Sequence, residues 1–312
     1  MPTRHLLLST EQARDLVGPL PPEVRVAVWN GSGEPPTELD RTQFWVPQML
    51  MAAGIDAMLA QLPALEVVQL TTAGADAFIG RLPDSVLLCD GRGVHGGSTS
   101  EWVLAVTLAA LRELPRFVRA QDERRWDYTF TGELAGKRVL VVGAGDVGGQ
   151  IRRKLLTFDT AVTMVARRAR AATGAEPAVH AVAELPDLLP AADVVVVVVP
   201  LTGATRGLVD AAFLAAMPDG ALLVNGARGP VVDTAALTAE LAAGRLRAAV
   251  DVTDPEPLPP DHPLWTVPGL LLTPHVAGSV HGFPARAYRL VREQLDRWLA
   301  GEPLINQVVD GY

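Results

Sequence analysis

A short apolar run, Val139–Val142, leads directly into a glycine-rich turn and then into the helical stretch Val147–Phe158. The turn has the spacing G-x-G-x-x-G, in which the first glycine permits a tight turn, the second lets backbone approach a pyrophosphate, and the third lets helix pack on strand. Amides and the dipole at the helix start favour phosphate charge. The segment therefore predicts a dinucleotide site. The residues assigned to it are Gly143, Gly145, Asp146, Val147 and Gly148.

The rest of the chain repeats this alternation of apolar runs and helical stretches. Short runs rich in β-branched residues are typical of strands buried on both faces of a parallel sheet. The predicted strands are Val24–Trp29, Val67–Leu70, Val86–Cys89, Val139–Val142, Val162–Val165, Val194–Val199, Leu222–Val224 and Ala248–Val252. Helical stretches such as Thr234–Ala243 lie between several of them. The pattern predicts an α/β fold with doubly wound sheets.

Two long helices are predicted to connect two domains. The chain has 312 residues, more than the roughly 250–300 at which single cores stop growing. One helix should begin at Ser98, which with Glu101 forms the S-x-x-E capping pattern, and end at Leu114 before Pro115. The other, Pro284–Ala300, would return the chain to the first domain.

We therefore predict two Rossmann-like domains, the first of them discontinuous. Residues 1–98 with 284–312 would form the substrate domain, and residues 99–283 the dinucleotide-binding domain. A cleft between two such domains is a natural place for a ligand.

Charge and cysteine content narrow the class of protein further. The formal net charge of -8 argues against a nucleic-acid or anionic-membrane surface. The one cysteine, Cys89, excludes an intramolecular disulfide and favours a reducing compartment, and its place after an apolar run predicts a buried thiol. The most apolar stretch, Val194–Val199, is far below the ~20 residues of a membrane span. We expect a cytoplasmic protein without a metal site.

Two arginines follow the strand after the glycine turn. At this place, about twenty residues on, an NAD site usually carries Asp or Glu for the ribose 2′-hydroxyl. Here Arg167 and Arg168 stand instead, and a 2′-phosphate would accept charge-assisted hydrogen bonds from them, each worth roughly 1.5–3 kcal/mol. A solvated basic loop, with Arg170 as a third charge, is the alternative. We predict NADP(H) as the preferred cofactor, with NAD(H) as the second choice.

Three ionisable residues follow predicted strands, at the edge where open α/β sheets bind ligands: Arg228, Glu256 and His275. Reduction of a 2-oxo acid needs a proton donor, and histidine can act as acid or base near neutrality. A carboxylate orients the imidazole, and arginine binds a carboxylate through two parallel hydrogen bonds. Each residue alone has a plainer interpretation: a packed histidine, a solvated turn glutamate, or an arginine paired with an acid.

Taken in order and together, the motifs resemble the D-isomer specific 2-hydroxyacid dehydrogenases over most of the chain. The matching segments are Ala73-Gly74-Ala75-Asp76, the turn at Gly143, Pro200-Leu201-Thr202, Asn225–Asp233, Asp251–Pro259, Pro263-Leu264-Trp265 and Thr273–Gly278. The resemblance implies an NAD(P)-dependent enzyme in which His275 is the acid/base, paired with Glu256. Arg228 would hold the substrate carboxylate, and backbone amides at Ala73 and Gly74 would bind its other oxygens.

The same resemblance implies further contacts and an assembly. Pro200, Thr202 and Asp251 would contact the cofactor, with Asp251 near the nicotinamide amide. The family also implies a homodimer built largely on the cofactor domain, and a cleft that closes on the substrate to exclude water.

Several positions depart from the family or match it weakly. Asp159 stands where the family often has glycine, and Asp tolerates the left-handed conformation better than most residues. The first-domain loops that contain Trp29, Trp45 and His95 should carry selectivity for the substrate side chain. Trp29, Trp45 and Trp265 either shape a small pocket or pack in the core or against a partner subunit.

Three kinds of function fit these residues. The favoured one is reduction of a small 2-oxo acid such as glyoxylate or hydroxypyruvate. Phosphite and formate dehydrogenases use related machinery, although formate relatives usually have glutamine at the place of Glu256. A nicotinamide-binding regulator or corepressor could keep the same three residues, and loss of turnover in a His275 variant separates it from an enzyme.

Overall fold

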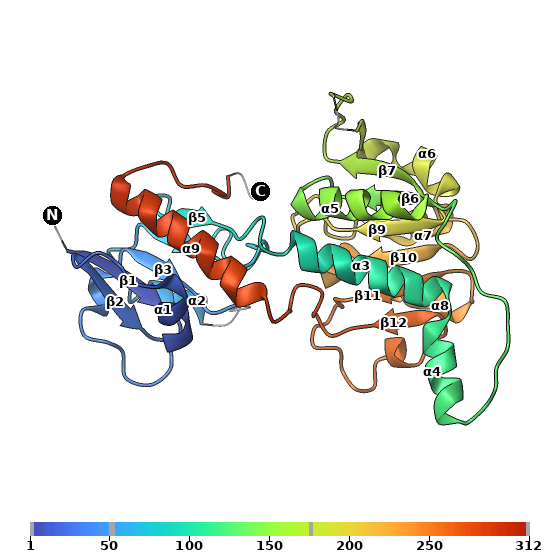
Figure 1. Ribbon diagram of the computed structural model, residues 1–312, viewed down its shortest axis with the longest axis horizontal. Coiled ribbons are helices and arrows are strands. Elements are labelled where there is room, and N and C mark those ends of the chain that lie inside the picture. Colours follow the sequence, from blue (N-terminus) through green and yellow to red (C-terminus); the bar gives the residue numbers. More distant parts are fainter. Residues whose placement is uncertain (1–2, 50–53, 175–176, 310–312) are drawn as a thin grey trace. The chain divides into compact units, whose positions relative to one another are not determined.

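The computed structural model describes residues 3–49, 54–174 and 177–309 and divides the chain into two compact units (Figure 1). Unit 1 comprises Met1–His95 and His281–Tyr312, and unit 2 comprises Gly96–Val280. Each unit is built on its own parallel sheet with helices on both faces. The predicted fold class, two Rossmann-like α/β domains of which the first is discontinuous, is confirmed.

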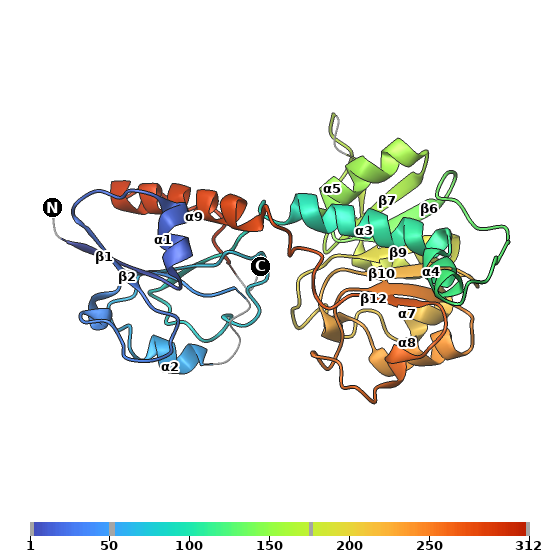
Figure 2. The same cartoon turned by 60° about the horizontal axis from the view of Figure 1, so that its bottom comes forward.

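Unit 1 holds a five-stranded parallel sheet of order β2-β1-β3-β4-β5. The strands are β1 (Arg4–Leu8), β2 (Val24–Val28), β3 (Phe44–Val46), β4 (Val67–Gln69) and β5 (Leu87–Cys89). Helices α1 (Glu11–Val17) and α9 (Phe283–Ala300) pack on one face, and α2 (Ile55–Leu59) packs on the other (Figure 2). Because α9 comes from the C-terminal part of the chain, the core of unit 1 is completed only after unit 2 has been traversed.

Strand β3 corrects one sequence interpretation. Trp45 is 1% exposed, and its ring packs at an edge against Phe78 in the core. The prediction that Trp45 belongs to a loop that selects the substrate is therefore wrong. The three-residue apolar run pairs with β1 and β4 on its two sides, and this burial is set by neighbours distant in sequence.

Unit 2 holds a seven-stranded parallel sheet of order β12-β11-β10-β9-β6-β7-β8. The strands are β6 (Arg138–Val142), β7 (Ala161–Ala166), β8 (Val179–Ala181), β9 (Val194–Val197), β10 (Leu222–Asn225), β11 (Arg247–Val250) and β12 (Leu270–Leu272). The helices are α3 (Gly96–Leu111), α4 (Leu114–Asp122), α5 (Asp146–Leu155), α6 (Leu185–Leu188), α7 (Ala211–Ala216) and α8 (Thr234–Ala242).

Both faces of the unit 2 sheet are covered, as the β-branched runs predict. Helices α3 and α5 pack on one face, and α6, α7 and α8 pack on the other (Figures 1 and 2). The four valines of β9 are all fully buried, so the central strand meets side chains on both sides. Asp159 lies beyond α5 with φ 55°, in the left-handed conformation expected of it.

The connecting helix starts earlier and ends earlier than its sequence predicts. Helix α3 begins at Gly96 and ends at Leu111, so Ser98 lies inside the helix and its predicted role as N-cap is wrong. Glu101 instead lies 3.6 Å from the Lys154 ammonium. Pro115 does not follow a longer helix but occupies the first turn of α4, where its fixed φ and missing N–H cost nothing.

Cys89, at the end of β5, is fully buried, and burial raises the pKa of its thiol from 9.0 to about 12. A rise of about three pKa units lowers the thiolate fraction at mildly alkaline pH about 10³-fold, and the thiolate is the reacting species. We expect the native protein to react with iodoacetamide at pH 8 about 10³-fold more slowly than the urea-unfolded chain. Equal labelling rates in the two states would contradict this burial.

Two surveys of the described residues bear on partners. No helix among them is both long and apolar enough to cross a membrane. No three or more His, Cys, Asp or Glu side chains gather there in a way that could hold a metal ion.

Candidate functional site

The glycine turn follows β6, which lies between β7 and β9 at the point where the strand order of unit 2 reverses. Gly143 has φ +122°, and a Cβ there would lie 2.5 Å from the carbonyl oxygen of Val198. A Cβ on Gly148 would overlap the Gly143 carbonyl, whereas nothing lies within 4 Å of the place of a Cβ on Gly145. Side chains are thus excluded where strand and helix meet, and the second glycine stays open. This cradle fits a pyrophosphate at the start of α5.

The N-terminus of α3 also lies beside the glycine turn. The glycine motif alone does not predict this contact. The backbone of Gly96, at the start of α3, packs so closely on the Asp146 side chain that a Cβ would collide with its carboxylate. The Lys154 ammonium donates hydrogen bonds to the Gly97 carbonyl at 2.8 Å and to Ser100 Oγ at 2.7 Å. Gly96 is the sequence signal for this close approach.

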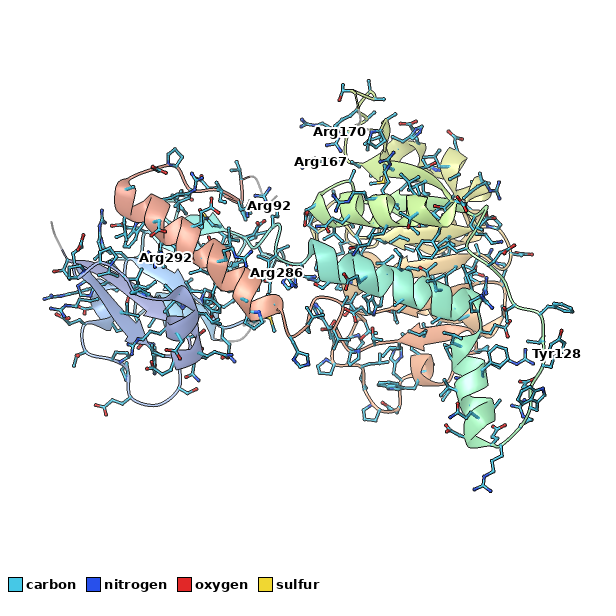
Figure 3. The ribbon with its side chains drawn as sticks, in the orientation of Figure 1. Arg92, Tyr128, Arg167, Arg170, Arg286 and Arg292 are labelled. Carbon is cyan, nitrogen blue, oxygen red and sulfur yellow. The ribbon has the colours of Figure 1, made fainter. Side chains whose placement is uncertain are left out.

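The basic residues after β7 lie at the same edge of the sheet. Arg167 and Arg168 are exposed, and Figure 3 shows Arg167 and Arg170 beyond the end of β7. The Arg170 guanidinium donates a hydrogen bond to the Ala144 carbonyl oxygen in the glycine turn, at 3.3 Å. Arg170, which the sequence indicates only as an extra charge, is therefore tied to the glycine turn.

Arg228, Glu256 and His275 follow three strands that are neighbours in the sheet, β10, β11 and β12. The carboxyl ends of adjacent parallel strands lie about 4.8 Å apart, so the loops meet at one edge. His275 Nδ1 and Glu256 Oε1 are 2.7 Å apart, and both side chains are partly exposed. With the proton on Nδ1, the imidazole donates to the carboxylate and leaves Nε2 for other partners.

The loop that carries His275 is anchored on Asp251, which is 3% exposed. The Asp251 carboxylate accepts hydrogen bonds from Thr273 Oγ1 (2.6 Å) and from the backbone amides of Val276 (2.9 Å) and Ala277 (2.8 Å). The His275 amide donates to the Asp251 carbonyl oxygen at 2.7 Å, and His275 has φ 54°. Sequence reasoning missed this anchoring role, and a contact of Asp251 with the cofactor stays a prediction.

The loop that contains Arg228 is likewise held by hydrogen bonds and backbone packing within unit 2. Arg228 donates from Nη1 to the Ala227 carbonyl at 2.8 Å, and the Ala227 amide donates to Asn225 Oδ1 at 3.0 Å. Gly229 packs directly on the Thr253 carbonyl, where a Cβ would overlap it. The Arg228 loop therefore rests on the segment that leads to Glu256, and a glycine is required at the contact.

Pro200 and Thr202 follow β9, the neighbour of β6 in the sheet. The Thr202 amide donates to Thr205 Oγ1 at 2.8 Å, and Thr205 Oγ1 donates to the Pro200 carbonyl at 2.6 Å. This turn lies at the sheet edge that also carries the glycine turn. Contacts of Pro200 and Thr202 with a cofactor stay predictions.

Ala73 and Gly74 belong to unit 1, where they follow β4. Thr72 Oγ1 donates to the Gly74 carbonyl at 3.3 Å, and the Gly91 amide donates to the Thr72 carbonyl at 2.7 Å. The segment is thus held at the carboxyl end of the unit 1 sheet, the side on which open α/β sheets bind ligands. Its predicted part in substrate binding stays a prediction.

The other aromatic residues considered for the substrate pocket, Trp29, Trp265 and His95, each contact a nearby residue of the same unit. The Trp29 indole donates to the Ser32 carbonyl at 2.7 Å, and the Trp265 indole donates to the Pro259 carbonyl at 2.8 Å. The His95 ring stacks on Phe283 with centroids 4.8 Å apart.

The unit 2 edge therefore combines three chemical capacities. The glycine turn offers backbone amides to phosphate, the His275–Glu256 pair can exchange a proton, and the guanidinium of Arg228 can bind an anion. Proton exchange next to an anion site and a dinucleotide cradle is what a hydride-transfer reaction of an organic acid requires.

Comparisons with known proteins agree with this chemistry. A family model described as D-isomer specific 2-hydroxyacid dehydrogenase, NAD binding domain, matches residues 104–277, more than half of the chain. A glyoxylate reductase of Thermofilum pendens is 32% identical over 275 residues, which cover 83% of this chain and 80% of the relative. A D-3-phosphoglycerate dehydrogenase of Archaeoglobus fulgidus is 33% identical over 218 residues, which cover 68% of this chain and 40% of that longer protein.

Solved structures resemble the whole chain. A D-isomer specific 2-hydroxyacid dehydrogenase from Xanthobacter autotrophicus Py2, in complex with NADPH and MES, is 32% identical with a TM-score of 0.85, and the match covers 100% of both chains. An NADPH-dependent glyoxylate/hydroxypyruvate reductase from Sinorhizobium meliloti, in complex with NADP and sulfate, is 26% identical with a TM-score of 0.85, again over 100% of both. The resemblance drawn from the motifs is confirmed: this chain belongs to the D-isomer specific 2-hydroxyacid dehydrogenases, a family of NAD(P)-dependent oxidoreductases.

Proposed function

We propose that this chain reduces small 2-oxo acids such as glyoxylate or hydroxypyruvate to the corresponding 2-hydroxy acids, with NADPH as the preferred donor. The observation that carries the proposal is the 2.7 Å distance between His275 Nδ1 and Glu256 Oε1. The loops of both residues lie at the same edge of the unit 2 sheet as the Arg228 loop and the glycine turn. A relative in sequence is named glyoxylate reductase, and a similar solved structure is named glyoxylate/hydroxypyruvate reductase. Unit 2 would bind the dinucleotide.

Each residue has one task in this reaction. A nicotinamide cofactor, when bound in the glycine cradle, would supply the hydride. Arg228 holds the substrate carboxylate through two parallel hydrogen bonds, helped by backbone amides at Ala73 and Gly74. His275, protonated on both nitrogens, donates its Nε2 proton to the carbonyl oxygen as negative charge develops there, while Glu256 accepts from Nδ1 and stabilises the imidazolium.

We propose a defined set of residues for binding of the dinucleotide. Amides at the start of α5 would meet the pyrophosphate, because nothing lies within 4 Å of the place of a Cβ on Gly145 and the backbone there is uncovered. Pro200, Thr202 and Asp251 would contact the nicotinamide half. These contacts position the reacting ring and supply no proton.

A substrate panel tests the proposal. Purified protein is assayed for NADPH consumption with glyoxylate, hydroxypyruvate, other 2-oxo acids, formate and phosphite, the last two in the oxidative direction with NADP and NAD. We expect turnover with at least one small 2-oxo acid. Binding of NADPH without turnover of any member of the panel would contradict the proposal and favour a cofactor-sensing regulator.

The preference for NADP(H) is a separate prediction. Arg167 and Arg168 stand exposed after β7, and the change of both to alanine removes charge-assisted hydrogen bonds to a 2′-phosphate. One or two such bonds at roughly 1.5–3 kcal/mol each should lower kcat/KM for NADPH about 10- to 100-fold or more, with little effect on NADH. Arg138→Ala, which removes an exposed pair with Asp193 at the other end of β6, is the control. A wild-type advantage for NADH would overturn the assignment.

We also infer that the chain forms a homodimer through unit 2, in the reducing compartment that its lone cysteine favours. The segment after α4 exposes three aromatic side chains, Trp126 at 95%, Tyr128 at 77% and Phe130 at 88% (Figure 3 labels Tyr128). Exposed aromatic residues grouped in this way are typical of protein–protein contacts. Sedimentation velocity at micromolar concentration should give a dimer, and the Trp126→Ala/Phe130→Ala double variant a larger monomer fraction. A monomeric wild type would contradict the inference.

A further inference from the structure

One side chain, Trp102 in helix α3, contacts both loops that carry the proposed reaction. Its indole Nε1 donates a hydrogen bond to Thr273 Oγ1 at 3.0 Å, on the loop of His275. Its ring lies against the backbone of Gly226, where a Cβ would come within 3.4 Å of the ring, on the loop of Arg228. Trp102 is part-buried among the apolar side chains between α3 and the sheet.

The hydrogen bond from Trp102 is the first of a series that connects α3, through Thr273 and Asp251, to the backbone next to His275. Thr273 Oγ1 accepts from the indole and donates to Asp251 Oδ1 at 2.6 Å, so its hydroxyl hydrogen has a single orientation. Asp251 Oδ1 also accepts the Val276 amide, and Oδ2 accepts the Ala277 amide. The two amides that directly follow His275 therefore depend on a carboxylate whose orientation Thr273 and Trp102 set.

His275 needs such support because of its backbone conformation. Its φ of 54° lies in the left-handed region, which a residue with a Cβ occupies only when the surroundings hold it there. The hydrogen bonds to Asp251 on both sides of His275 supply that restraint. A loosened anchor would let the loop relax and move the imidazole away from the working position.

We propose that Trp102 and Thr273 are positioning residues that keep the His275 loop and the Arg228 loop at a constant separation. Neither side chain is assigned a contact with substrate or cofactor. The indole ring packs against Gly226, and its N–H donates to Thr273. Both loops are therefore positioned by contacts with the same residue of α3. The inference deepens the proposed function and rests on it.

Conservative substitutions test the two contacts separately. Thr273→Val keeps the shape and removes the hydroxyl, Thr273→Ser keeps the hydroxyl, and Trp102→Phe keeps a ring and removes the N–H. Matched controls are Thr238→Val in α8, whose hydroxyl bonds only within its helix turn at 2.6 Å, and Trp298→Phe in unit 1, whose indole bond to Glu66 is also 3.0 Å.

The expected result is a loss of kcat without a loss of thermal stability. A displacement on the order of 1 Å costs up to about 10²-fold in rate, so we expect kcat for 2-oxo acid reduction to fall about 10- to 100-fold in Thr273→Val and Trp102→Phe. The melting temperature should match that of the controls, and Thr273→Ser should restore turnover.

Amide hydrogen exchange gives a readout that does not depend on turnover. The peptide spanning residues 274–280 should exchange faster in Thr273→Val and Trp102→Phe than in wild type, with other peptides of unit 2 unchanged. Wild-type exchange and wild-type kcat in both variants would overturn the proposal. So would a fall in kcat that is matched by a lower melting temperature, because that pattern describes general destabilisation. If wild type reduces no 2-oxo acid, the proposed function fails, and the exchange rates alone decide whether the loop is anchored.

Discussion

Replacing His275 by alanine should lower kcat for 2-oxo acid reduction about 10²–10⁴-fold, the contribution that general acid catalysis typically makes. The loss should appear in kcat and not in the NADPH Kd, because His275 is assigned to the carbonyl oxygen and not to the cofactor. Stopped-flow NADPH oxidation under saturating substrate measures the step, and cofactor fluorescence titration measures the Kd.

The chain offers a closely matched control for this variant. His180 pairs with Glu184 in the same way as His275 pairs with Glu256, with Nδ1 2.7 Å from a carboxylate oxygen in both cases. His180 lies at the other edge strand of the sheet, in β8. His180→Ala should keep wild-type kcat. If both histidine variants turn over as fast as wild type, His275 is not the acid/base.

Arg228→Gln should lower kcat/KM for 2-oxo acids by about 10²–10⁴-fold. Two charge-assisted hydrogen bonds at roughly 1.5–3 kcal/mol each correspond to this range. Glutamine keeps a polar side chain of similar reach but has no charge for the substrate carboxylate. Arg228→Lys should recover only a small part, because an ammonium cannot donate in the parallel fork of a guanidinium.

Steady-state kinetics with glyoxylate and hydroxypyruvate measure the effect of the arginine variants. Arg138→Gln, in an exposed arginine whose partner is Asp193, is the control for loss of an arginine in unit 2. An Arg228→Gln protein with wild-type kcat/KM would remove the guanidinium from the substrate site. An equal loss for NADPH binding would instead assign Arg228 to the cofactor.

Much of the site could be predicted because its signals are local. The glycine turn is contiguous, and its spacing is a local signal although only Gly148 meets a steric limit within the strand–turn–helix unit, against Gly143. Gly143 is limited by Val198, which follows β9, and Gly145 is left open. The sequence also predicts that each of the three ionisable residues follows a strand, because the apolar runs that form the strands can be recognised locally. The structure confirms this for Arg228, Glu256 and His275, which follow β10, β11 and β12.

Other features could not be predicted because they depend on contacts between distant segments. Trp102 and Thr273 are 171 residues apart, and nothing near either one indicates their hydrogen bond. The burial of Trp45 depends on β1 and β4, which flank a run of only three residues. The start of α3 at Gly96 depends on its close packing against α5, which overrides the capping pattern at Ser98.

The sequence by itself determined the α/β class, the parallel character of the sheets and the glycine cradle, because β-branched runs and glycine spacing act over a few neighbouring residues. Only the tertiary structure decided that β10, β11 and β12 lie side by side, so that the loops of Arg228, Glu256 and His275 meet at one edge. It also decided that Asp251 holds the His275 loop through three hydrogen bonds. The order of strands in a sheet and the partners of a buried carboxylate are set by packing of the whole unit, which no local pattern specifies.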